Sequence, residues 1–175
     1  MKKMMIDNAH SEIGFKVRHL MISTVKGNFQ TFNGGVDENG ELTVTINVNS
    51  INTGNSDRDG HLKSKDFFNV EEFPTIDFKS SVDSLKTHPI TGELTIKGIT
   101  KEVVLTSIYN GKSVDPWGNT KHGWELSFML NRNDYDLTWN TTLETGGVLV
   151  SEEVNITIDV QMMEVSEEIE TESAS

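Results

Sequence analysis

The sequence contains no cysteine, which excludes disulfide bonds, thiolate metal sites and cysteine nucleophiles together. It also has no apolar run approaching the ~20 residues that a helix needs to span a bilayer. The first seven residues, Met1 to Asp7, lack the apolar core of a secretory signal. We therefore expect a cytoplasmic protein without stable membrane insertion.

Positive charge is also scarce. The chain has 15 Lys and Arg against 27 Asp and Glu, a net charge of -12. Because phosphate binding depends on clustered bases, this balance excludes nucleic acid as a partner and disfavours anionic membrane surfaces. Catalytic signatures such as a Gly-x-Ser-x-Gly elbow, a Walker-type loop or a Gly-x-Gly-x-x-Gly motif are missing too. We expect no enzymatic activity and no cofactor.

What the sequence does have is alternation of apolar and polar residues, which is typical of strands with one buried face. Residues 41–50 are the clearest case, with Leu42, Val44, Ile46 and Val48 on one face after a turn at 37–40. Similar alternation occurs at 13–19, 76–82, 94–96, 103–109, 124–130 and 154–162.

Residues 25–36 break this alternation, because Phe29 and Phe32 are three apart, and Gly27, Gly34 and Gly35 indicate a bulge or a bend. Only 56–68 is a candidate helical stretch. About eight strands at regular spacing predict an antiparallel barrel or sandwich, and the curvature favours the barrel. We predict an all-β fold, an eight-stranded antiparallel barrel with one or two short helices.

The chain divides into one domain, 1–163, and a terminal segment, 164–175. That segment has five acidic residues and no basic one, with a single Ile. It cannot bury enough apolar surface to order itself, so we predict a disordered acidic tail.

Metal binding has little support. Residues 55–66 come close to a calcium-binding EF-hand loop, but Asn55 replaces the first acid and Asp66 the bidentate Glu. The alternative is a solvated turn that caps a short helix. The histidines show no metalloprotease spacing; they are His10, His19, His61, His88 and His122. We expect no metal site.

Aromatic residues fall mostly on the inward faces of the predicted strands. They fit either a packed core or the lining of a ligand cavity, because an eight-stranded barrel is near the width at which either is possible. His19 continues the inward face of the first long strand, as a hydrogen-bonded core residue or as a ligand contact.

Several blocks of residues resemble the YceI-like family of polyisoprenoid-binding, lipocalin-like proteins, over about residues 7–163. The most specific block is Arg58 to Phe68, which also explains the near EF-hand loop without calcium. The others are His10-Ser11 with Phe15, Val17 and His19; Val25, Gly27, Phe29 and Phe32; Ser50-Ile51 with Thr53; Phe73-Pro74; Phe78 with Ser80; Gly92 to Val104; and Asp115 to Gly118 with Gly123. Residues 133–136 and Lys121 depart from the family pattern.

The resemblance implies a lipocalin-like barrel with an extended lipid in its central tunnel, and a homodimer. It implies a tunnel lining of Phe15, Val17, Phe29, Phe32, Phe78, Leu94, Ile96 and Phe128. His19, Arg58 and Asp59 would be polar contacts or structural pins.

Three functions follow as hypotheses. The first is non-catalytic binding of a polyisoprenoid lipid or isoprenoid quinone precursor for storage or transport. Burying about 20 ligand carbons at ~0.8 kcal/mol each gives roughly 16 kcal/mol, against an association cost of ~4–15 kcal/mol. The second is an enzyme acting on such a lipid with His19 and a nearby carboxylate. The third is a ligand-free structural or stress protein with a filled barrel.

Overall fold

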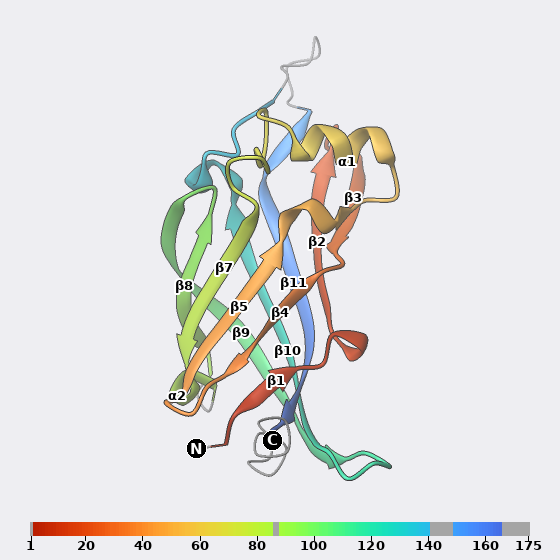
Figure 1. The fold of residues 1–175 in the computed structure, drawn as a ribbon. Helices are drawn as coiled ribbons and strands as arrows, with labels where there is room; N and C mark the ends of the chain where they lie inside the picture. Colours follow the sequence, from red (N-terminus) through yellow and green to blue (C-terminus); the bar gives the residue numbers. More distant parts are fainter. Residues whose placement is uncertain (1, 86–87, 141–148, 166–175) are drawn as a thin grey trace.

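The computed structural model describes residues 2–85, 88–140 and 149–165, which form one curved antiparallel sheet (Figure 1). Eight strands close into a ring, because β1 pairs with both β4 and β11. In order they are β1 (Met4–Ile6), β4 (Phe32–Val36), β5 (Glu41–Asn47), β7 (Thr75–Ser81), β8 (Ile90–Ile96), β9 (Ile99–Val114), β10 (Thr120–Asn131) and β11 (Val150–Glu164). The predicted eight-stranded, lipocalin-like antiparallel barrel is confirmed.

Three more strands extend the wall: β2 (Glu12–His19), β3 (Ser23–Phe29) and β6 (Ile51–Asn52). The long strand β11 pairs with β1 through Met162–Glu164 and with β2 through Val150–Asp159. A 3-10 turn, η1 (Asn8–His10), separates β1 from β2, and the Asp7 side chain caps it by accepting from the Ala9 N–H. The first two strands therefore follow one another along the same edge of β11.

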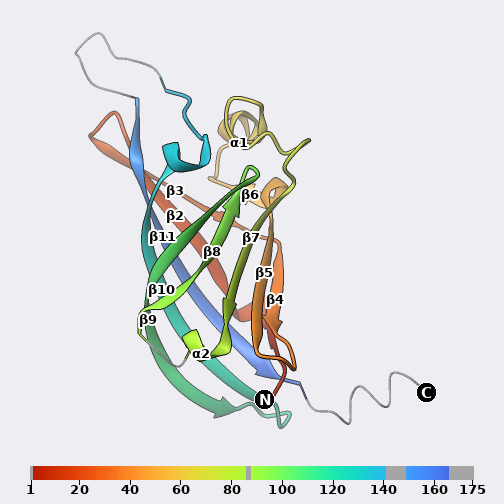
Figure 2. The same cartoon turned by 90° about the vertical axis from the view of Figure 1, so that its left-hand side faces the viewer.

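Two α-helices lie at opposite ends of the described barrel (Figure 2). Helix α1 (Ser56–Lys63) covers one end, and α2 (Val82–Leu85) lies at the other; we call these the α1 end and the α2 end. The Asn55 side chain caps α1 by accepting from the Arg58 N–H at 3.0 Å. Residues 56–63 are thus helical, as the capping alternative to an EF-hand loop predicted.

Two predicted strands differ in detail. Strand β5 ends at Asn47 instead of Ser50, because the Asn47 side chain accepts from the Asn49 N–H and residues 48–50 form the 3-10 turn η2. Tyr109 shares the inward face with the buried Trp124, as alternation predicts, because the two residues pair and their rings lie 5.2 Å apart, but 51% of Tyr109 is exposed. The β9–β10 ladder has a register shift between Gly123 and Trp124.

The predicted domain boundary at residue 163 falls inside β11, which continues through Glu164. The Val165 N–H then donates to the Lys3 carbonyl at 2.8 Å. The remainder of the predicted tail, residues 166–175, lies outside the described residues. In the part of the chain that is described, no helix has the length and apolar character to cross a membrane.

Closure of the ring depends on a glycine. Gly35 on β4 lies against β1, and a Cβ there would overlap the carbonyl oxygen of Met4. We expect Gly35→Ala to lower the free energy of unfolding by about 1–3 kcal/mol, because β1 must move away from β4. Urea denaturation measures this loss.

Gly14→Ala on β2 is the matched control. A Cβ at Gly14 meets its nearest atom at 3.6 Å, an ordinary contact. We expect this control to change stability by no more than about 0.5 kcal/mol. Equal effects of the two substitutions would contradict the role given to Gly35.

Candidate ligand-binding cavity

The interior of the barrel holds two adjoining cavities. The inner chamber, inside the ring of strands, has a volume of about 130 Å³, and the outer chamber, toward the α1 end, has about 460 Å³. Both are lined by the same five residues at their junction: Phe29, Ile76, Ile96, Leu130 and Ile156. The two chambers therefore adjoin inside the barrel, with these five side chains at their boundary.

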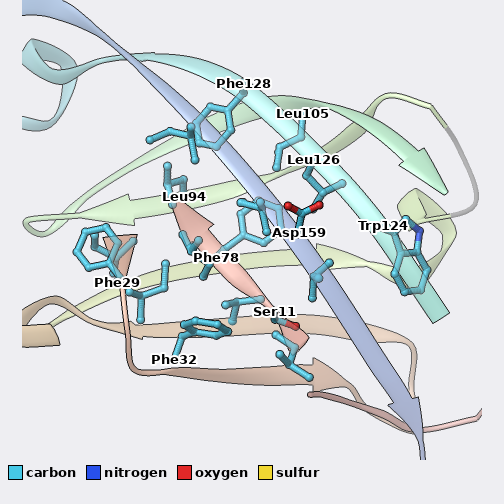
Figure 3. A pocket seen from close by; sticks show the side chains of 18 of the residues that line it. Ser11, Phe29, Phe32, Phe78, Leu94, Leu105, Trp124, Leu126, Phe128 and Asp159 are labelled. Carbon is cyan, nitrogen blue, oxygen red and sulfur yellow. The ribbon is translucent and has the colours of Figure 1, made fainter. Parts of the chain in front are cut away.

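The inner chamber is almost wholly apolar (Figure 3). It receives the inward side chains of alternate positions on the ring strands, as period-two alternation requires. Six residues of the predicted tunnel lining are among its walls: Phe29, Phe32, Phe78, Leu94, Ile96 and Phe128. Trp124 also lines it, and its buried Nε1 has no hydrogen-bond partner among the described residues. This chamber suits a hydrocarbon chain.

Two glycines make room for phenylalanine rings in the walls. A Cβ at Gly92 would overlap the ring of Phe78, and a Cβ at Gly27 would overlap the ring of Phe15. Gly27 pairs in regular register with Phe15, so it marks a close ring contact instead of a bulge. The bend predicted in this region lies at residues 30–31, between β3 and β4.

The outer chamber lies between the β2–β3 hairpin, α1, residues 130–139 and residues 149–156. Of the predicted site residues, Phe15, Val17, His19, Phe29, Ile96 and Arg58 line it. Several polar residues also line it, although the side chain of the first is exposed on the outside of β2: Arg18, His19, Thr53, Asp57, Arg58, His61 and Arg132. It therefore combines an apolar interior with groups that can bind a polar head.

Arg58 and Asp59 have different roles. The Asp59 carboxylate accepts from the Thr53 N–H at 2.9 Å and from its hydroxyl at 2.6 Å. These two bonds attach α1 to the chain after β6. Asp59 is not among the residues that line the outer chamber. Arg58 also donates to Thr53, through Nε to the hydroxyl and through an Nη to the carbonyl, each at 2.8 Å, but it lines the outer chamber as well.

Arg132 is a buried cation that no sequence motif marks. It begins the 3-10 turn η3 (Arg132–Tyr135), and only 4% of it is exposed. Its guanidinium donates to the carbonyls of Leu137 and Trp139 at 2.6 and 2.9 Å, and to those of Val150 and Ser151 at 3.2 and 2.8 Å. Burial lowers its pKa. In a sequence, an Arg beside Asn131 and Asn133 looks like part of a solvated turn.

An aromatic cluster closes one side of the outer chamber. The rings of His61 and Trp139 have centroids 4.7 Å apart, and Phe67 packs on both, at 5.2 Å from His61 and 5.4 Å from Trp139. His61 also contacts the Asp66 carboxylate at 2.9 Å. The cluster joins α1 to the segment that Arg132 holds, which no local pattern predicts.

His19 lines the outer chamber, as its alternation predicted. Among the residues that the structure describes, its ring forms no hydrogen bond with a carboxylate, and Asp57 is the carboxylate found in the lining of the same chamber. The acid–base pair required by the enzymatic hypothesis is not assembled in this conformation.

A polar cluster surrounds the β1–β11 closure at the α2 end. Lys121 donates to Asp7 at 2.6 Å and lies 3.8 Å from Asp115. Nearby, the Glu164 carboxylate is 2.9 Å from His122 Nε2 and accepts from Lys2 at 3.1 Å. Lys121, a departure from the family pattern, thus links η1 to the β9–β10 hairpin. These groups support the wall and lie apart from the outer chamber.

This cluster predicts acid sensitivity. The hydrogen bond with His122, assisted by Lys2, lowers the pKa of Glu164, and the bond from Lys121 lowers the pKa of Asp7. Carboxylates with lowered folded-state pKa values stabilise the protein above their unfolded pKa values and lose this contribution as the pH falls below them. We expect Glu164→Gln to cost about 0.5–1 kcal/mol at pH 7 and less at pH 3.

Urea denaturation at both pH values measures the difference. Glu38→Gln is the control, because Glu38 lies exposed in the turn before β5. A loss for Glu164→Gln that is the same at both pH values would contradict the assignment.

The fold and the cavity define a closed, eight-stranded, lipocalin-like barrel with an apolar interior. The model of the YceI-like domain matches residues 4–162, and the chain belongs to that family. The hydrogen bonds of Arg58 and Asp59 to Thr53, the close contacts of Gly27 and Gly92 with phenylalanine rings, and the residues that line the two chambers all lie within the matched range.

Individual relatives agree with this assignment. The UPF0312 protein SA2479 of Staphylococcus aureus strain N315 is 41% identical over 155 residues, which cover 85% of this chain and 90% of that protein. The YCEI protein of Campylobacter jejuni has a solved structure with a TM-score of 0.68 and 32% identity, covering 91% of this chain and 96% of that one. A polyisoprenoid binding domain from Saccharophagus degradans shares the fold, with a TM-score of 0.78 at 15% identity, covering 94% and 100%.

Proposed function

We propose that this protein binds one long-chain lipid, a polyisoprenoid or an isoprenoid quinone precursor, inside the barrel and stores or transports it without chemical change. The observation that carries the proposal is the pair of adjoining chambers with mainly apolar walls inside the barrel. The binding activity named for the Saccharophagus degradans domain, which has the same fold, supports it.

The chemistry of the chambers gives the ligand a direction. The inner chamber offers almost only carbon, so it takes the end of the hydrocarbon chain. The outer chamber carries Arg58 and His61, so it takes the polar head. Apolar contact supplies most of the affinity, and the polar groups select the head.

The cavity argues against a filled structural barrel, which requires side chains where the chambers are open. The enzymatic alternative lacks its acid–base pair among the described residues. Of the three hypotheses, non-catalytic lipid binding agrees best with this interior. The homodimer and the cytoplasmic location stay predictions.

Mass spectrometry of an organic extract tests the proposal. The protein is purified, extracted with solvent and compared with a delipidated sample, while native mass spectrometry counts ligands and subunits. We expect one polyprenyl or quinone species per barrel. Repeated extracts without lipid, together with failure of the delipidated protein to bind a dansyl-labelled geranylgeraniol probe, would overturn the proposal.

A further inference from the structure

The β2–β3 hairpin exposes large apolar side chains at its tip. Met21 is 58% exposed and Ile22 is 80% exposed. The tip is a tight turn in which Leu20 and Met21 both have positive φ, 54° and 60°, and the Ile22 N–H donates to the His19 carbonyl. Turns of this kind favour Asn and Gly. Here the turn holds bulky apolar residues in solvent, which indicates that the tip contacts an apolar phase.

The outer face of the same hairpin is basic although the protein is acidic. Residues 13–36 contain no Asp or Glu but include Lys16, Arg18 and Lys26. All three side chains are exposed, and Lys16 lies directly opposite Lys26 in the β2–β3 register. Like charges in this position repel each other. An anionic surface would relieve that repulsion.

Within the described residues, none of these three bases forms an ion pair. Arg18 donates instead to two neutral acceptors, the Thr24 hydroxyl and the Met21 carbonyl, through exposed hydrogen bonds. The acids nearest in register are Glu152 and Glu153, in the irregular part of β11 opposite Arg18. The hairpin therefore keeps its positive charge available.

The hairpin also forms part of the wall of the outer chamber. Its inner face supplies Phe15, Val17, His19 and Val25 to the outer chamber. The hairpin projects at the end of the barrel that carries α1 (Figure 2). The apolar tip, the basic face and part of the chamber wall thus belong to one element, the β2–β3 hairpin.

We propose that the β2–β3 hairpin docks reversibly on an anionic lipid bilayer, with Met21 and Ile22 entering the interface and Lys16, Arg18 and Lys26 facing the headgroups, so that lipid passes directly between bilayer and outer chamber. This inference rests on the proposed function, since a bilayer is where a polyisoprenoid resides. The net charge of the whole molecule opposes binding, but screening limits charge effects to about 10 Å, so the local charge of the hairpin decides.

An alternative role for the hairpin's charges is to protect a sheet edge from aggregation, but this role explains fewer of its features than docking does. Among the described strands, β3 pairs with β6 only through Asn28 and Phe29, so the rest of β3 is an open edge where a lysine hinders aggregation. That accounts for Lys26 alone. Lys16 lies on β2, which pairs on both sides, and apolar residues at the tip would promote aggregation.

Flotation with vesicles tests the docking. The vesicles are phosphatidylcholine with or without phosphatidylglycerol, and the protein is the full chain. We expect association with the anionic vesicles only, reduced about 30-fold by combining Lys16→Gln with Lys26→Gln. Combining Met21→Ser with Ile22→Ser should reduce it at least about tenfold.

The matched controls lie on other strands. Lys79→Gln with Lys101→Gln removes the same charge from β7 and β9, and Val104→Ser with Ile108→Ser removes exposed apolar groups from β9. Both controls should bind vesicles like the unmodified protein. Equal losses in controls and hairpin variants, or equal binding to neutral and anionic vesicles, would overturn the docking.

A second readout separates this inference from the proposed function. Binding of dansyl-labelled geranylgeraniol is measured without vesicles, and its transfer from vesicles is followed by stopped flow. We expect the hairpin variants to bind the probe within about twofold of the unmodified protein but to acquire it from anionic vesicles at least tenfold more slowly. Normal binding with unchanged transfer overturns the docking and leaves the proposed function intact. Absence of probe binding in the unmodified protein counts against the proposed function, while flotation still decides the docking.

Discussion

Replacing Arg132 with methionine is expected to lower the free energy of unfolding by about 3–5 kcal/mol. Arg132 donates to four backbone carbonyls, those of Leu137, Trp139, Val150 and Ser151. Methionine fills a similar space but donates nothing, so these carbonyls lose their partner where water has little access. The loss should appear in urea denaturation monitored by tryptophan fluorescence.

Two further variants define the cause. Arg18→Met removes an exposed guanidinium from β2, and we expect it to change stability by no more than about 0.5 kcal/mol. Arg132→Lys keeps the charge but loses the planar fork, so it should recover only part of the stability. If Arg132→Met and Arg18→Met had equal effects, Arg132 would not hold η3 to the start of β11.

Replacing Ile156 with tryptophan is expected to weaken binding of dansyl-labelled geranylgeraniol at least about 100-fold, because the indole blocks the passage between the chambers. Ile156 lines both chambers and pairs with Phe15 on one side and Phe128 on the other. A ligand then reaches only one chamber and loses much of its apolar contact. Fluorescence titration measures the affinity.

The adjacent residue gives the control. Thr157 points outward on β11 and pairs with Gly14, so Thr157→Trp adds the same side chain outside the barrel. It should bind the probe within about twofold of the unmodified protein. Full affinity in Ile156→Trp, in a protein that remains folded, would show that the ligand does not cross the junction.

Alternation predicted the barrel well because a strand with one buried and one solvent-exposed face alternates between apolar and polar residues. The run from Val154 to Met162 on β11 shows this directly, since its apolar members line the interior. Irregular segments were harder to predict. The end of β5 at Asn47 depends on a local side-chain hydrogen bond, and the register shift between β9 and β10 depends on how two strands pair.

The polar part of the site was only partly predictable. Alternation placed His19 in the chamber, and the family resemblance marked Arg58 and Asp59. Arg132 and the His61–Trp139 contact come together from segments far apart in the sequence. Such contacts depend on how the barrel curves and where α1 crosses its end. Period and spacing carry no information about either.

The pairing of β1 with β11 also determines when the cavity first exists. Met4 pairs with Glu164 and Ile6 with Met162, so nearly the whole barrel sequence lies between the two strands. Contacts that span so long a loop form late and slow the folding of a chain. During synthesis the earlier strands must wait, with their apolar faces uncovered, until β11 leaves the ribosome. The closed barrel can therefore take up lipid only after β11 has been synthesised and has paired with β1.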